Sequence, residues 1–206
     1  MKLKTVSLIL IGWLVVMVGI AQAEWNSQGW TQGRIVDEFD EEYAKCMFIR
    51  STGAFKNSAT SGSVLYAEIL IYKSKTSSHM CERLKKEYPM LGEDYWKEAC
   101  SLDVNVGVFL HEYNTRSAAA YFIGDDGYII MKNTKGEKVT FKNPGKWSNV
   151  GLRIKQSDVL VSFFKKSSGV IKVVVSDGHS SRYYFEVTAD GFNKLYNSLP
   201  YQIVNE

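Results

Sequence analysis

Three cysteines are the residues of this sequence whose type and spacing best suit covalent chemistry: Cys46, Cys81 and Cys100. If the chain is exported, as argued below, two of them are expected to pair. A bridge between Cys81 and Cys100 would close about 20 residues and contribute roughly 3 kcal/mol in the chain-entropy account. We therefore expect a disulfide between Cys81 and Cys100, with Cys46 as a buried thiol. The other pairings, Cys46 with Cys81 or with Cys100, stay open.

Two short motifs contain residue types that ligate metals. His79 and Cys81 are one residue apart, but no second ligand pair follows at zinc-finger spacing. Asp125-Asp126-Gly127 resembles part of a calcium loop, yet the alternate acids and the distal Glu of such a loop are missing. A disulfide at Cys81 and a hairpin turn at 124–127 explain these residues better. We expect no metal and no other cofactor.

Common catalytic motifs are absent from the sequence. It contains no G-x-S-x-G nucleophile elbow and neither of the glycine-rich phosphate loops. His111 lies in an expected strand and His179 at an expected loop tip, and a lone histidine more often has a structural or solvated role. Nothing local supports Cys46 with a distant histidine as a nucleophile. The sequence therefore predicts no catalytic residues and no enzyme.

Three tryptophans could contribute to a binding surface. Trp25 and Trp30 lie near the start of the chain and Trp147 lies further on. Scattered aromatic side chains more often belong to the core or its rim. We therefore expect these tryptophans in the core or at its rim rather than on a binding surface.

The first 23 residues have the features of a secretory signal peptide. Lys2 and Lys4 precede an apolar run from about Val6 to Ile20, and Ala21-Gln22-Ala23 is an A-x-A cleavage site. The run is short for a membrane span, which needs about 20 apolar residues. We expect cleavage between Ala23 and Glu24, and no integral membrane segment after the signal is removed.

The charge of the mature chain is close to neutral. Of 25 basic residues, Lys2 and Lys4 leave with the signal, so 23 remain against 22 acidic residues. These charges are interspersed and form no basic stripe in the sequence, so we do not expect nucleic-acid binding. The 13% aromatic content is typical of a folded chain.

The clearest element is a β-hairpin near the C-terminus. Val170–Ser176 and Arg182–Val187 are rich in β-branched and aromatic residues, and the polar loop 177–181 separates them. A loop that is symmetric about His179 pairs Lys172 with Glu186 on the solvent face and places three apolar or aromatic pairs on the other face. A shift of one residue would bury both charges, so the register is specified.

Helices are expected on both sides of the hairpin. Ser157–Lys166 has an acidic start and a basic end, and Gly169 would stop it. The second helix would be capped by Thr188 and stopped by Pro200. Its apolar residues recur at helical spacing: Phe192, Leu195, Tyr196 and Leu199.

The remaining segments are mainly strand-like. About nine strands at short spacing, with turn residues between them, predict a mainly β protein with an immunoglobulin-like sandwich. Residues 24–206 would form one domain. It would contain a small helical insertion at 77–101, a C-terminal helix, a loose N-terminal arm at 24–42 and a long loop at 56–62.

The C-terminal stretch resembles the invasion-associated locus B family of bacterial exported proteins. The resemblance rests on Lys165-Lys166, the strand Val170–Ser176, the turn Asp177-Gly178, the strand Tyr183–Val187, and Gly191-Phe192 at the start of the last helix. It covers about 45 residues, and a weaker similarity lies in SGSVLYAEILIYKS. Family members usually have a close cysteine pair that this chain lacks at about 128–140. The resemblance implies an immunoglobulin-like fold and carries no catalytic residues.

The resemblance favours one function over two others. It implies an exported, non-enzymatic interaction protein, in the periplasm or on the outer surface, that binds an unknown protein or envelope partner and takes part in host-cell association or invasion. One alternative is a periplasmic carrier of a small ligand or lipid, which would need an apolar cavity. The other is an enzyme with an unrecognised site, which would need a cleft with a perturbed titratable residue.

Overall fold

The protein is mainly β, as the sequence predicts. The computed structural model describes residues 29–36, 42–76, 78–90, 102–113, 116–117, 126–147 and 151–204. The described strands are β1 (Thr31–Val36), β2 (Glu42–Lys56), β3 (Ser61–Thr76), β4 (Leu102–Glu112), β5 (Arg116–Ser117), β6 (Tyr128–Lys132), β7 (Lys138–Lys142), β8 (Gly145–Trp147), β9 (Gly151–Arg153), β10 (Val170–Ser176), β11 (Arg182–Thr188) and β12 (Tyr201–Val204). The helices are α1 (Ser78–Glu87), α3 (Ser157–Lys166) and α4 (Phe192–Ser198).

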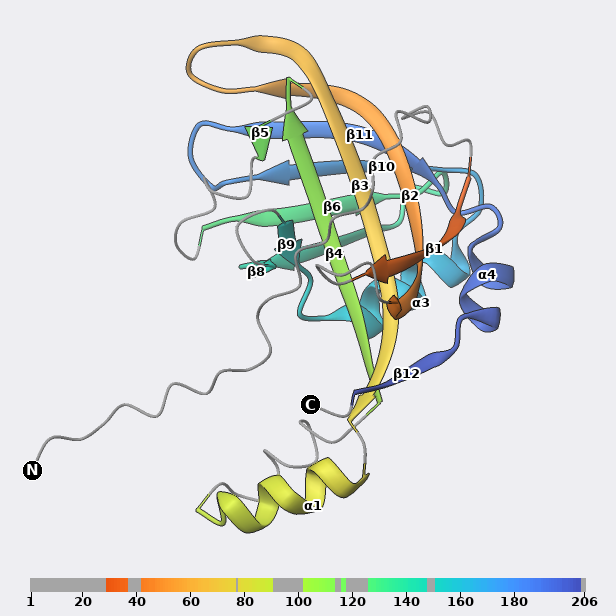
Figure 1. Ribbon diagram of the computed structural model, residues 1–206. Coiled ribbons are helices and arrows are strands. Elements are labelled where there is room, and N and C mark those ends of the chain that lie inside the picture. Colours follow the sequence, from red (N-terminus) through yellow and green to blue (C-terminus); the bar gives the residue numbers. More distant parts are fainter. Residues whose placement is uncertain are drawn as a thin grey trace, which may run out of the picture.

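The described strands form one hydrogen-bonded sheet. Its order is β7-β6-β10-β11-β2-β3-β4-β9-β8, with β1 beside β2, β12 beside β3 and β5 beside β4. β12 runs parallel to β3, and the other described pairs are antiparallel. The sheet curls, so that β3 and β4 cross in front of the strands β6, β10 and β11 (Figure 1). The more specific immunoglobulin-like arrangement of two sheets is not confirmed.

The long strands β2 and β3 lie in the middle of the sheet, between the strands β7-β6-β10-β11 on one side and β4-β9-β8 on the other. They contain 15 and 16 residues, and their register shifts between Phe55 and Lys56. The sequence predicts a long loop at 56–62, but the structure has a tight turn there. Asn57 Oδ1 accepts hydrogen bonds from the amides of Ala59 and Thr60, at 2.8 and 2.9 Å. The connection can be short because the Asn57 side chain accepts hydrogen bonds from two of the turn's own amides.

Alternation along the strands gives the sheet an apolar inner face. On β10, Ile171, Val173 and Val175 are buried, while Lys172 is exposed. The hairpin register is confirmed, since Lys172 pairs with Glu186 and Val173 with Phe185. Lys172 Nζ lies 3.8 Å from Glu186 Oε1, on the solvent side. The interior is thus filled by side chains of the inner face together with those of α3 and α4.

Both helices beside the hairpin are confirmed, with one correction. Leu160, Val161 and Phe164 bury one side of α3. Thr188 does not cap α4: its N-cap is Gly191, in the left-handed region at φ 82°. The hydroxyl of Thr188 instead accepts a hydrogen bond from the amide of Asp190 at 3.0 Å. Thr188 still belongs to β11, so it lies too early in the chain to reach the first turn.

The expected loose N-terminal arm is wrong for its described part. β1 pairs with β2, and Trp30 packs against the helices. Trp30 Nε1 donates to the carbonyl of Thr188 at 2.8 Å, and its ring lies edge-on to Phe164 and Phe192, with centroids 5.3 and 5.0 Å away. Trp30 therefore belongs to the core rim.

In the expected helical insertion, α1 is confirmed. The rest of the insertion, from 91 to 101, lies outside the described residues. None of the described helices is long and apolar enough to cross a membrane.

Candidate functional site

Within the described residues, the side chains that the sequence singled out lie on different elements. Cys81 is buried on α1, and Cys100 lies outside the described residues, so their pairing stays a prediction. Ala23 and Glu24, the expected cleavage site, also lie outside them. Cys46 is buried on β2, and its expected state as a thiol stays a prediction.

The metal motifs gain no support within the described part of the chain. No group of three or more His, Cys, Asp or Glu side chains is placed there to hold a metal ion. Asp125 lies outside that part, and Asp126 is exposed beside the glycine of the β10–β11 loop. The side chains of His79 and Trp147 are likewise not described, and Trp25 lies outside the described residues.

The two histidines whose side chains are described lie on different elements. His111 is half-buried on β4, and burial lowers its pKa below the ordinary 6.5. His179 is exposed in the loop between β10 and β11.

A buried polar pair lies at one end of the inner face. Tyr183 Oη donates to Glu112 Oε1 at 2.8 Å, and both residues are buried. Burial is the main cause that raises the Tyr183 pKa, and the adjacent Glu112 carboxylate adds to it. A perturbed pKa can indicate catalysis, but a substrate must also reach the group. Both side chains are closed off from solvent, so a substrate does not reach this pair.

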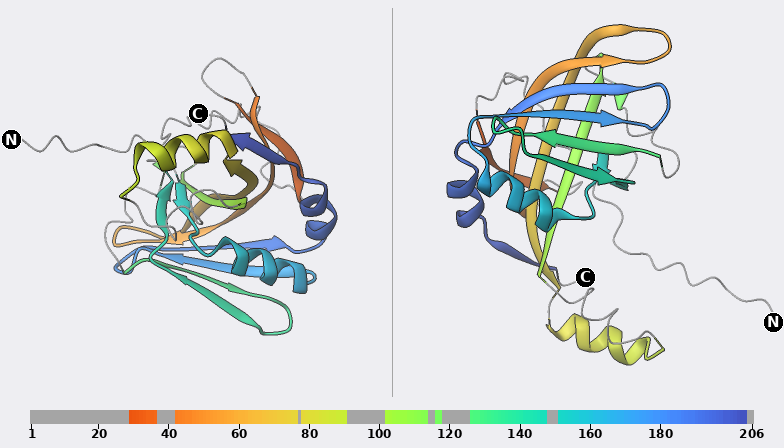
Figure 2. Two further views of the ribbon diagram at one scale, coloured as in Figure 1. Left: turned by 90° about the horizontal axis from the view of Figure 1, so that it is seen from below. Right: turned by 180° about the vertical axis from the view of Figure 1, so that it is seen from behind.

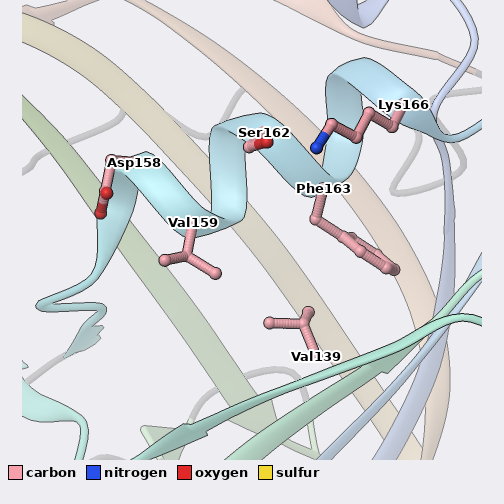
Figure 3. A pocket seen from close by; sticks show the side chains of 6 residues that line it. All are labelled: Val139, Asp158, Val159, Ser162, Phe163 and Lys166. Carbon is pink, nitrogen blue, oxygen red and sulfur yellow. The ribbon is translucent and has the colours of Figure 1, made fainter.

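The described residues form a groove between helix α3 and the edge strand β7 that is open to another molecule. It has a volume of about 400 Å³ and is lined by Val139, Asp158, Val159, Ser162, Phe163 and Lys166. Val159 and Phe163 project from α3 towards Val139 on β7 (Figure 3). Val159 is 40% exposed, and Val139 and Phe163 are partly exposed. The floor of the groove is therefore apolar and open to solvent.

Strand β7 is the end of the sheet. Among the described residues it pairs with β6 alone. Seen from behind, β11, β10, β6 and β7 follow one another, and α3 comes next beyond β7 (Figure 2). The free edge of β7 thus lies beside the groove.

The hydrogen-bond pattern identifies the backbone groups at this free edge. The amide of Asn143 bonds to the Gly127 carbonyl at 2.9 Å, and the amide of Asn133 to the Glu137 carbonyl at 3.0 Å. Hydrogen-bonded pairs alternate along an antiparallel ladder, so Val139 and Phe141 also point their backbone groups to β6. The amides and carbonyls that point away from β6 belong to Lys138, Thr140 and Lys142.

Asn133 fixes α3 relative to the β6–β7 turn. Its Nδ2 donates to Glu137 Oε2 at 2.7 Å and to Ser167 Oγ at 3.1 Å. Its Oδ1 accepts from the amides of Lys135 and Glu137, at 3.1 and 3.0 Å. Asn133 is buried, and Ser167 follows directly after α3. This side chain therefore holds one end of the groove at a set width.

Exposed lysines line the same edge on the outer face of the sheet. Lys132 on β6 lies directly opposite Lys138 on β7, and Lys142 lies further along β7. All three are exposed, and no carboxylate in the described part of the chain forms an ion pair with them. A second groove of about 450 Å³ lies on this face, lined by Asp126, Gly127, Tyr128, Ile130, Lys138, Thr140, Lys142 and Asn143.

Sequence reasoning missed this site. The alternation in KVTFK predicts a strand, but nothing in the sequence shows that it is the edge strand or that α3 lies beside it. The lysines at both ends of the segment were the available signal, because edge strands often carry lysine.

Comparisons with protein-family models, with curated proteins and with solved structures found no match. The resemblance to the invasion-associated locus B family therefore stays a prediction.

Proposed function

We propose that this protein is an exported, non-enzymatic interaction protein that binds an extended segment of a partner protein along β7. The observation that carries the proposal is the free backbone edge at Lys138, Thr140 and Lys142, directly beside an apolar groove. An extended peptide can add to such an edge, where main-chain hydrogen bonds give affinity and pockets for alternate side chains give specificity.

Export is supported by the signal-like segment at 1–23, with cleavage between Ala23 and Glu24. The periplasm or the outer surface would then be the location. Association with a host cell is supported by the family resemblance alone. The β7 edge gives such an association a physical means, since it needs only an extended segment on the partner.

The geometry favours this reading over the two alternatives. A carrier of a small ligand or lipid would use a cavity inside the sheet, whereas the α3–β7 groove lies at the sheet's edge and buried side chains of the described residues pack on the inner face. An enzyme would need a reachable pair of titratable groups, and the pair Tyr183–Glu112 is closed off from solvent.

Substitutions on β7 and α3 test the proposal. Peptides selected from a random library should bind wild-type protein, and Thr140→Pro should abolish their binding. The Thr140 amide makes no bond to β6, so proline at this edge position removes the donor without breaking the sheet. The matched variant Thr140→Val keeps the donor and should still bind. Val159→Asp should weaken binding by placing a charge in the groove.

Circular dichroism and thermal unfolding would show that each variant is folded. The proposal is contradicted if no peptide binds, or if folded Thr140→Pro binds selected peptides as tightly as wild type does.

A further inference from the structure

The side chains around β7 specify the chemistry of the segment that it binds. We propose that the partner segment alternates acidic and apolar residues, with its acids opposite Lys138 and Lys142 and an apolar residue in the α3–β7 groove. This inference rests on the proposed function, because it assumes that a strand adds to β7.

The first observation is a row of charged residues, three of them lysines, that ends at the free edge. Across the outer face, the aligned residues are Glu186, Lys172, Lys132 and Lys138, on β11, β10, β6 and β7. Glu186 ends the row on β11 and lies 3.8 Å from Lys172. At the β7 end, no carboxylate of the described chain is paired with Lys138. The next position in the row belongs to whatever strand adds to β7.

The pairing geometry brings two of these charges close together. Lys132 and Lys138 lie opposite each other, in a pair that does not exchange backbone hydrogen bonds. Side chains are closer in such pairs, and like charges directly opposite are unfavourable. An acidic residue in the next position would relieve this repulsion.

The other nearby charges leave the edge cationic. Lys142 and the turn residue Lys135 add positive charge, while Glu137 carries negative charge and accepts from Asn133. Asp126 lies at the far end of the outer groove, beyond Lys142. On α3, Asp158 and Lys166 line opposite ends of the inner groove, so their charges offset each other.

The inner face sets the alternate positions of the partner. In a strand, successive side chains point to opposite faces, so residues next to those opposite Lys138 and Lys142 point inwards. One of them lies opposite Val139 and meets Val159 and Phe163 in the groove. An apolar side chain fits there because it covers surface that is otherwise in water.

The same lysines disfavour a second copy of this chain as the occupant. Two β7 strands paired antiparallel about Thr140 would place Lys138 opposite Lys142 twice. Lysines on an edge strand are a known protection against such pairing. They repel an identical edge and attract an acidic one.

A set of short designed peptides tests the inference. Each alternates Val with one other residue, which is Glu, Thr or Lys, and binding is measured by fluorescence anisotropy at low and high ionic strength. The Glu peptide should bind about threefold to tenfold more tightly than the Thr peptide, as expected for two exposed ion pairs. The Lys peptide should bind most weakly, and the advantage of Glu should shrink as salt is added.

Charge reversal gives the matched control. Lys138→Glu should reverse the order and favour the Lys peptide, whereas Lys194→Glu, an exposed change on α4, should leave the order unchanged. Equal affinity for the Glu and Thr peptides, with both abolished by Thr140→Pro, would overturn the acidic preference and keep strand addition. No binding by any peptide, or concentration-dependent pairing through β7 itself, would overturn both.

Discussion

Asn133 is the residue on which the geometry of the groove most depends. It makes four hydrogen bonds, three within the β6–β7 turn and one to Ser167, directly after α3. Removing a buried side chain leaves its partners without a bond, which costs more than the bond itself contributes.

We expect Asn133→Ala to lower the free energy of unfolding by about 2–3 kcal/mol. Urea denaturation would measure the change. Thr134→Ala, which removes one exposed hydroxyl that bonds to the Ser168 carbonyl, should cost less than about 1 kcal/mol. Similar losses in both variants would show that Asn133 has no special role.

Glu68 gives a prediction for pH. Burial raises its pKa above the ordinary 4.5, although Arg50, 2.6 Å away, opposes the shift. The folded protein therefore keeps this proton to a higher pH than the unfolded chain does. The stability that results is present below pH 4.5 and is lost as pH rises through the raised pKa.

The measurement is the unfolding free energy of wild type minus that of Glu68→Gln, at several pH values. The difference should fall as pH rises from about 4 to 7. A difference that grows over this range would mean that Arg50 outweighs burial and lowers the pKa.

At the scale of elements, the pairing of β2 with β11 joins the strands β7-β6-β10-β11 to the rest of the sheet. Gly53 lies opposite Phe185, and a Cβ on Gly53 would come within 2.0 Å of the Tyr184 carbonyl oxygen. That atom belongs to the backbone, so it cannot rotate away. Gly53→Ala should destabilise the protein by about 3 kcal/mol, as overpacking does.

Gly145 is the matched position. A Cβ there meets its nearest neighbour at 3.5 Å, an ordinary contact. Thermal unfolding of Gly145→Ala should therefore stay close to wild type. If Gly53→Ala were as stable as wild type, the close approach of β2 and β11 would be incorrect.

The elements also show what the sequence could and could not predict. The β10–β11 register followed from residues that are close in sequence, since a shift would have buried Lys172 and Glu186. The position of β7 at the edge of the sheet could not be predicted, because the order β7-β6-β10 depends on strands that are far apart in the chain. The place of Trp30 at the core rim was expected, but its contacts could not be predicted, because its partners Phe164 and Phe192 come more than 130 residues later.

At the scale of the whole molecule, export and oxidation can be tested together. Protein recovered from the exported fraction should begin at Glu24, and its intact mass should be two hydrogens lower than that of the fully reduced chain. Peptide mapping should then show Cys81 bonded to Cys100, with Cys46 reduced. A start at Met1, or three thiols in that fraction, would contradict the expectation.

The central claim is that β7 presents an open edge, and amide hydrogen exchange of the free protein tests it most directly. The amides of Val139 and Phe141 should exchange slowly, because they point to β6, and those of Lys138, Thr140 and Lys142 should exchange fast. Adding the Glu–Val peptide should slow the three fast amides. If all five amides are equally protected in the free protein, the edge is covered and the account is wrong.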